Sequence, residues 1–154
     1  MESLTLPLDH AAIEKILPHR YPFLLVDRIT DIEVDKRIVG IKNVSSNERY
    51  LTTDPDGRRV LPPTILTEAI AQVGAIMILA KPENREKLAL LVGIERVRFR
   101  GPVYAGDTVT IEVTVKRFRS RMGILAGVAR VDGRTVIEGI MTCALGPRDG
   151  KLPA

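Results

Sequence analysis

The segment that most constrains the fold is Thr64 to Ala80, which is apolar on nearly every side. Pro62-Pro63 precedes it and Lys81-Pro82 follows it, so both ends of one long helix are marked. Its apolar side chains are Ile65, Leu66, Ala69, Ile70, Val73, Ile76, Met77 and Leu79. A helix of this kind is buried on most sides. The rest of the chain is therefore expected to wrap around it.

Strand-like segments after this helix are expected to supply the wrapping. They are Leu88 to Phe99, Thr108 to Phe118, Gly123 to Val131 and Arg134 to Leu145. The Asp132-Gly133 pair between the last two segments is a strong signal for a tight hairpin. A short helix over 9–17, an extended segment over 21–34 and a second strand over 37–44 are expected before the long helix. The pattern predicts an α+β fold, with a curved antiparallel sheet wrapped around one helix.

The 154 residues suit a single domain over 1–154, with a flexible tail over about 147–154. Only 4% of the residues are aromatic, so aliphatic side chains must fill the core. Cys143 is the single cysteine and lies in an apolar run, where a buried hydrophobic role is expected. No signal peptide or membrane span is recognisable, and a cytoplasmic location is expected.

The formal net charge is +4, and basic residues are densest over 96–100 and 116–121. These segments are either solvated strand faces or a docking surface for an acidic protein or a phosphate-bearing ligand. Nucleic-acid binding is not expected, because no recognition motif accompanies the charge. Neither His10 nor His19 has further ligands at metal-binding spacing. No metal or cofactor is therefore expected.

Three polar side chains interrupt the apolar helix at intervals of four residues: Thr64, Glu68 and Gln72. This spacing puts them on one face. Because a glutamate is seldom fully buried without a partner, the face must meet solvent, a cavity or another subunit. Two interpretations remain open, a polar edge bonded to nearby backbone and the wall of a ligand cavity. The polar loop over 45–61 precedes this face, and loops of such length are often binding or lid elements.

Several segments in the same order carry a family resemblance. They are Leu17 to Arg28, Ile41 to Val44 with Asn47-Glu48, Glu68 to Gln72, and Arg98 to Val103 with Gly106-Asp107. Over about residues 10–145 the chain resembles the (3R)-hydroxyacyl-acyl-carrier-protein dehydratases, which are lyases. The resemblance implies a hot-dog fold around the helix at about 64–80. It also implies a homodimer or a trimer of dimers with shared active sites, and an acyl carrier protein or acyl-coenzyme A partner in fatty acid or polyketide metabolism.

Two positions depart from the family's active-site pattern. Asp54 stands where the family has its catalytic histidine, and Pro63 stands where a glycine N–H binds the thioester carbonyl. Imidazole titrates near neutrality, whereas an ordinary aspartate titrates near about 3.9 and is a weaker base. Proline has no N–H, and losing one such donor typically costs about 10²–10³ in rate. The family's helix acid is retained as Glu68.

The resemblance therefore implies a divergent member that binds an acyl chain or acyl thioester without normal dehydratase activity. Glu68 and Asp54 are its catalytic candidates, and Thr64, Gln72 and Pro63 are its substrate-binding candidates. One alternative is an acyl thioesterase that uses Asp54 or Glu68. Another is a dehydratase subunit that is active only with a homologous partner. Asp54 also fits an ordinary turn in the segment 53–57, so its role stays open.

Overall fold

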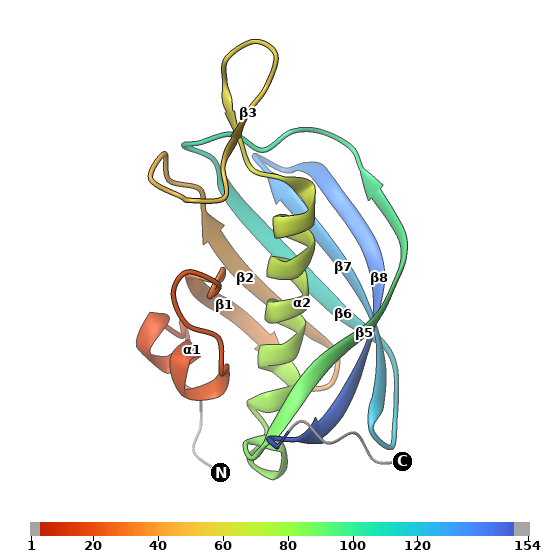
Figure 1. Cartoon of the computed structure of the whole chain (residues 1–154). Coiled ribbons are helices and arrows are strands. Elements are labelled where there is room, and N and C mark those ends of the chain that lie inside the picture. Colours follow the sequence, from red (N-terminus) through yellow and green to blue (C-terminus); the bar gives the residue numbers. More distant parts are fainter. Residues whose placement is uncertain (1–3, 150–154) are drawn as a thin grey trace.

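The computed structural model describes residues 4–149, in which six antiparallel strands form a sheet that curves around a central helix (Figure 1). The strands are β1 (Arg28–Glu33), β2 (Arg37–Asn43), β5 (Lys87–Phe99), β6 (Thr108–Arg119), β7 (Met122–Val131) and β8 (Arg134–Pro147). Their order in the sheet is β1-β2-β6-β7-β8-β5, so β1 and β5 are its edges. The predicted α+β fold, a sheet wrapped around one helix, is confirmed.

The central helix α2 (Pro63–Leu79) follows the predicted boundaries within one residue and crosses the concave face of the sheet. Ala69, Val73 and Ile76 have no exposed surface, as expected for a helix that is apolar on nearly all sides. Glycines on the sheet allow the helix to approach closely. A Cβ atom added to Gly127 would lie 2.2 Å from Cγ2 of Ile70.

The N-terminal segment forms the expected short helix and then runs beside α2 (Figure 1). Helix α1 (His10–Ile16) begins after Asp9, whose side chain accepts a hydrogen bond from the backbone N–H of Ala12 at 2.9 Å. The extended segment predicted over 21–34 becomes a strand only from Arg28 onward. In its earlier part, the side chain of Gln72 binds the backbone of Phe23 and Leu25.

The segment 45–61 was predicted to be a loop, but part of it is regular structure. It contains a small hairpin, β3 (Thr52–Thr53) and β4 (Arg59–Val60), which projects beyond the end of the main sheet (Figure 1). The hairpin is attached at its base, where the N–H of Leu61 donates to the carbonyl oxygen of Val103 at 2.8 Å. A buried ion pair between Lys42 and Glu48, 2.9 Å apart, ties the preceding loop to β2.

Other local predictions were also accurate. Asp132 and Gly133 both have positive φ, 49° and 77°, as the tight hairpin between β7 and β8 requires. After α2 the chain makes one 3-10 turn, η1 (Pro82–Asn84), before β5 begins. No helix among residues 4–149 is long and apolar enough to cross a membrane. Of the predicted tail, Pro147 still belongs to β8, and residues 150–154 lie outside the described residues.

Candidate functional site

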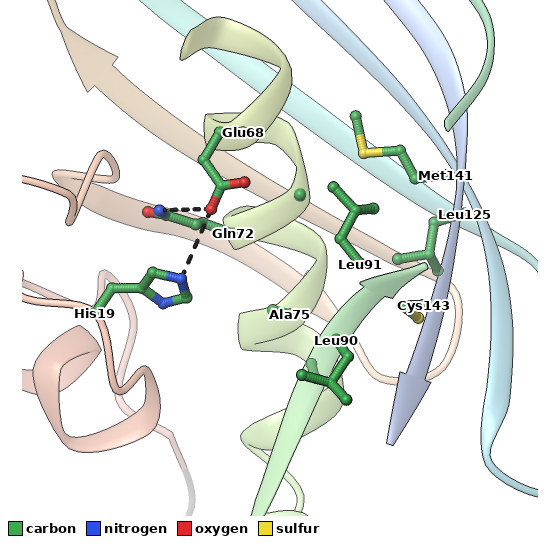
Figure 2. A pocket seen from close by; sticks show the side chains of 11 residues that line it. His19, Glu68, Gln72, Ala75, Leu90, Leu91, Leu125, Met141 and Cys143 are labelled. Atoms are coloured by element: carbon green, nitrogen blue, oxygen red, sulfur yellow. Dashed lines mark hydrogen bonds and ion pairs between the residues drawn. The ribbon is translucent and has the colours of Figure 1, made fainter. Parts of the chain in front are cut away.

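A cavity of about 140 Å³ lies between α2 and the inner faces of β5, β7 and β8 (Figure 2). One wall is polar and carries His19, Glu68 and Gln72. The remaining lining is apolar apart from one thiol and comprises Ala71, Ala75, Ala89, Leu90, Leu91, Leu125, Met141 and Cys143. A few polar groups on an otherwise apolar wall are typical of a site for a ligand with a polar head and an apolar chain.

Larger hollows occur elsewhere, but they lack this combination of groups. A cavity of about 380 Å³ near the start of α2 has Arg100 as its charged residue, and a groove of about 480 Å³ lies beside Leu4 and Leu6. Arg100 already pairs with Glu138 at 2.6 Å. We therefore place the candidate site in the cavity that holds the carboxylate and the imidazole.

Gln72 is the buried anchor of the polar wall. Only 1% of its surface is exposed, and its amide makes three hydrogen bonds. The amide oxygen accepts from the backbone N–H of Leu25 at 2.9 Å, and the amide nitrogen donates to the carbonyl oxygen of Phe23 at 2.7 Å. The same nitrogen donates to Oε1 of Glu68 at 3.0 Å. Gln72 thus holds the N-terminal segment and the Glu68 carboxylate in one arrangement.

Glu68 and His19 face each other beside this anchor (Figure 2). Oε1 of Glu68 lies 3.6 Å from Nε2 of His19, and their side chains are 22% and 27% exposed. Nδ1 of His19 is buried and has no hydrogen-bond partner within the described part of the chain. Burial lowers the pKa of His19 below its ordinary value of 6.5, although the Glu68 carboxylate acts in the opposite direction. The imidazole is therefore neutral near pH 7.

The predicted polar face divides between two surroundings. Glu68 and Gln72 line the cavity, whereas Thr64, one turn earlier, is exposed and is not among the cavity's lining residues. Pro63 is the first residue of α2 and lines the separate cavity of about 380 Å³. Each of the two interpretations of this polar face is therefore partly correct. Gln72 bonds to nearby backbone, and it also lines a cavity.

Asp54 lies in the β3–β4 hairpin and is not among the residues that line the cavity with Glu68. Its carboxylate accepts hydrogen bonds from the backbone N–H groups of Asp56 and Arg58, at 3.0 and 2.8 Å. Those bonds close the turn of the hairpin, as expected for aspartate in this kind of sequence. The guanidinium of Arg58 lies 3.4 Å from the centre of the Tyr104 ring.

Cys143 is buried on β8, as its apolar surroundings predicted, and it faces the cavity. Burial raises the pKa of its thiol, so the sulfur stays protonated at neutral pH and is a poor nucleophile. No group of three or more His, Cys, Asp or Glu side chains within residues 4–149 is arranged to hold a metal ion.

Sequence reasoning missed the role of His19 in this wall. His19 lies in no metal-ligand spacing and in no serine-hydrolase motif, and it precedes Glu68 by many residues in the chain. One usable signal was the need of a helix glutamate for a polar partner. The chain has only two histidines, and His19 belongs to one of the segments that carry the family resemblance.

Comparison with known proteins gives consistent results. The model of the FabA-like domain matches residues 17–140. The 3-hydroxyacyl-acyl-carrier-protein dehydratase FabZ of Anoxybacillus flavithermus is 48% identical over 141 residues, covering 92% of this chain and 99% of the relative. The FabZ of Bacillus subtilis strain 168 is 48% identical over 139 residues, covering 90% of this chain and 99% of the relative.

Solved structures share the fold at low sequence identity. The dehydratase heterocomplex ApeI:P from Xenorhabdus doucetiae has a chain that superposes with a TM-score of 0.77 at 19% identity, covering 94% of both chains. A hypothetical thioesterase protein with coenzyme A from Streptococcus pneumoniae TIGR4 gives a TM-score of 0.60 at 12% identity, covering 77% of this chain and 84% of the other. These two likenesses support the hot-dog fold.

Proposed function

Because the chain belongs to the FabA-like family of 3-hydroxyacyl-acyl-carrier-protein dehydratases, we propose that it binds an acyl thioester beside Glu68 and that its dehydration step is impaired. The names of the relatives make an acyl carrier protein the first candidate carrier. An acyl-coenzyme A is the second. The polar wall suits the thioester head, and the apolar lining from β5, β7 and β8 suits a short acyl chain. The cytoplasmic location stays a prediction.

The observation that carries this proposal is the position of Asp54. A general base must come within hydrogen-bonding reach of the proton that it removes. The Asp54 carboxylate is instead used by two backbone N–H groups of its own hairpin. We therefore assign Asp54 to the turn and not to proton transfer. Glu68 keeps the acid position of the family pattern, so binding and orientation of the hydroxyacyl group are retained.

Pro63 impairs the same step in a different way. Dehydration builds negative charge on the thioester oxygen, and the family uses a glycine N–H at the start of the helix to stabilise that charge. Proline at this position offers no N–H. The loss of one such donor typically lowers the rate by about 10²–10³. The two substitutions together are expected to leave slow dehydration at most.

A direct assay tests the proposal. Purified protein is mixed with a short 3-hydroxyacyl thioester of coenzyme A, and enoyl formation and thiol release are followed in parallel. We expect stabilisation against heat by the thioester, slow enoyl formation and no thiol release. The double variant Asp54→His with Pro63→Gly should form enoyl product at least about 10²-fold faster. Enoyl formation that is fast without those changes, or a lack of thermal stabilisation, would contradict the proposal.

The retained helix residues favour one second candidate, a subunit that works with a homologous partner. Glu68 and Gln72 keep their places on α2, while the hairpin has lost its histidine. In a shared site such a chain contributes the acid and receives the base from its partner. Mixing the protein with a histidine-bearing FabZ should then give more activity than the sum of the two proteins measured separately.

The thioesterase alternative predicts thiol release that disappears in Glu68→Gln.

The exposed edge strand supports the homodimer that the family resemblance implies. An edge strand presents unpaired backbone N–H and C=O groups. On β5 this edge also carries the apolar side chains of Leu91, Val92 and Ile94, which are 39%, 50% and 49% exposed. Exposed apolar residues along an unpaired edge are typical of a pairing surface. We propose that two copies pair along β5.

A further inference from the structure

An imidazole stands beside Glu68 even though the family's histidine position is occupied by Asp54. His19 and Glu68 come from segments far apart in the chain, yet Nε2 and Oε1 are 3.6 Å apart. Both residues line the same cavity, and both side chains are partly exposed. His10, the other histidine, is the first residue of α1, and its side chain is 59% exposed.

We propose that His19 is a catalytic residue of this cavity, accepting a proton from the bound acyl group while Glu68 acts as the proton donor. This inference rests on the proposed function, since it requires an acyl thioester in the cavity. It assigns the slow reaction that remains to two side chains of a single chain. Asp54 has no part in it.

The backbone around His19 is held in place on both sides. The guanidinium of Arg20 donates to the carbonyl oxygens of Leu17 at 2.8 Å, of His19 at 2.7 Å and of Glu14 at 2.9 Å. On the other side, Gln72 binds the backbone of the 23–25 segment and also the Glu68 carboxylate. One amide therefore positions both the segment that follows His19 and the carboxylate that faces it.

The protonation state of His19 suits a base. Burial favours the neutral imidazole at neutral pH. Since Nδ1 has no hydrogen-bond partner in the described residues, none of them holds the ring in one tautomer through Nδ1. With its proton on Nδ1, the imidazole leaves the Nε2 lone pair on the side of Glu68. The Nε2 to Oε1 separation of 3.6 Å is longer than a hydrogen bond, so Nε2 is not hydrogen-bonded to Glu68.

Dehydration moves two protons, one from the substrate to His19 and one from Glu68 to the leaving hydroxyl. Nε2 of His19 takes the proton from the carbon next to the thioester carbonyl, and that electron pair forms the carbon–carbon double bond. The bond from the β-carbon to the hydroxyl oxygen breaks, and the oxygen takes the proton of the Glu68 carboxyl group and leaves as water. Proton transfer from His19 to Glu68 then restores both residues. The products are an enoyl thioester and water.

Within residues 4–149, the titratable and charged groups considered around the imidazole come from α2, from β8 and from the neighbouring Arg20. Glu68 faces it from α2, and Cys143 lines the same cavity from β8 as a protonated thiol. Arg20 follows it in the chain, with its guanidinium turned toward three backbone carbonyls. The step uses one proton shared between His19 and Glu68, so the rate should depend on pH through His19, whose pKa lies below 6.5. Replacement of His19 should remove that dependence.

The test measures hydration of a short enoyl thioester of coenzyme A, the reverse of the same step, with the full chain. We expect slow wild-type hydration that falls about 10²-fold or more in His19→Ala and in His19→Gln. The matched control His10→Ala should match the wild type. Thermal stabilisation by a saturated acyl-coenzyme A, which reports binding alone, should persist in both His19 variants.

Separate results overturn the inference and the proposed function. Wild-type hydration no faster than buffer, or hydration unchanged in folded His19→Ala or His19→Gln, would overturn the role of His19 while leaving binding intact. Loss of the acyl-coenzyme A stabilisation in the wild type would overturn the proposed function itself. If His19→Ala does not fold, His19→Gln keeps a polar side chain of similar reach and decides the question.

Discussion

At the scale of single residues, Gln72 links the parts of the site that come from different regions of the chain. Its amide satisfies a backbone N–H and a backbone C=O of the segment before β1, and it also orients Glu68. The residue is almost completely buried. A buried polar group left without its partner is costly. Gln72 is therefore as important for the fold as for the site.

Replacing Gln72 with leucine should destabilise the protein by about 2–4 kcal/mol, because the N–H of Leu25 and the C=O of Phe23 lose their buried partner. Urea unfolding measures the change. Thr64→Ala is the control on the same helix face, since Thr64 is exposed, and should change stability by no more than about 0.5 kcal/mol. Equal effects of the two substitutions would contradict the anchoring role.

His19 should make the stability of the protein depend on pH. Burial lowers its pKa in the folded state below 6.5, so the unfolded chain binds the proton more readily. The stabilising effect of a neutral His19 is fully present above 6.5 and is lost as the pH falls through that value toward the folded-state pKa. Unfolding free energies between pH 7.5 and 5 should therefore fall more steeply for the wild type than for His19→Gln. Parallel pH profiles would argue against a buried neutral imidazole.

At the scale of elements, the contact between α2 and the concave face of the sheet determines how closely the core packs. At the points of closest approach, either the strand or the helix has a glycine. Gly127 on β7 faces Ile70, and Gly74 on α2 faces Leu125. Aliphatic side chains fill the interior around these points of close approach. The cavity beside Glu68 is lined partly by the same elements.

Gly127→Ala should destabilise the fold by about 1–3 kcal/mol, because the new methyl group would meet Cγ2 of Ile70 at 2.2 Å. The matched control is Gly93→Ala on β5, where the nearest atom would be Cβ of Thr142 at an ordinary 3.5 Å. Urea unfolding of both variants is the measurement. A Gly93→Ala effect as large as that of Gly127→Ala would show that helix–sheet contact is not the cause.

At the scale of the whole molecule, the sheet has one edge at β1 and one at β5. The β5 edge runs the length of the sheet (Figure 1) and carries no fully buried residue. An unpaired edge with exposed apolar side chains at 91, 92 and 94 invites pairing with another chain. Pairing of two copies would extend the sheet and cover the exposed side chains next to the cavity, to which Leu91 contributes.

Val92→Lys combined with Ile94→Lys should convert the proposed dimer to a monomer, because pairing would place four lysines along one interface. Sedimentation analysis gives the mass in solution. Val34→Lys is the matched control, since Val34 is a 59% exposed apolar residue in the turn between β1 and β2. The control should leave the mass unchanged. A wild-type monomer, or a dimer that survives both β5 changes, would contradict pairing along this edge.

The amino-acid sequence by itself determined the helix that lies at the centre of the fold, the strands that surround it and the tight turn at Asp132-Gly133. These features depend on short-range periodicity, proline positions and backbone preference. Only the tertiary structure decided that Gln72 holds the segment before β1 and that His19 meets Glu68. These contacts join residues tens of positions apart. They depend on how closely helix and sheet pack, and no local sequence pattern encodes that packing.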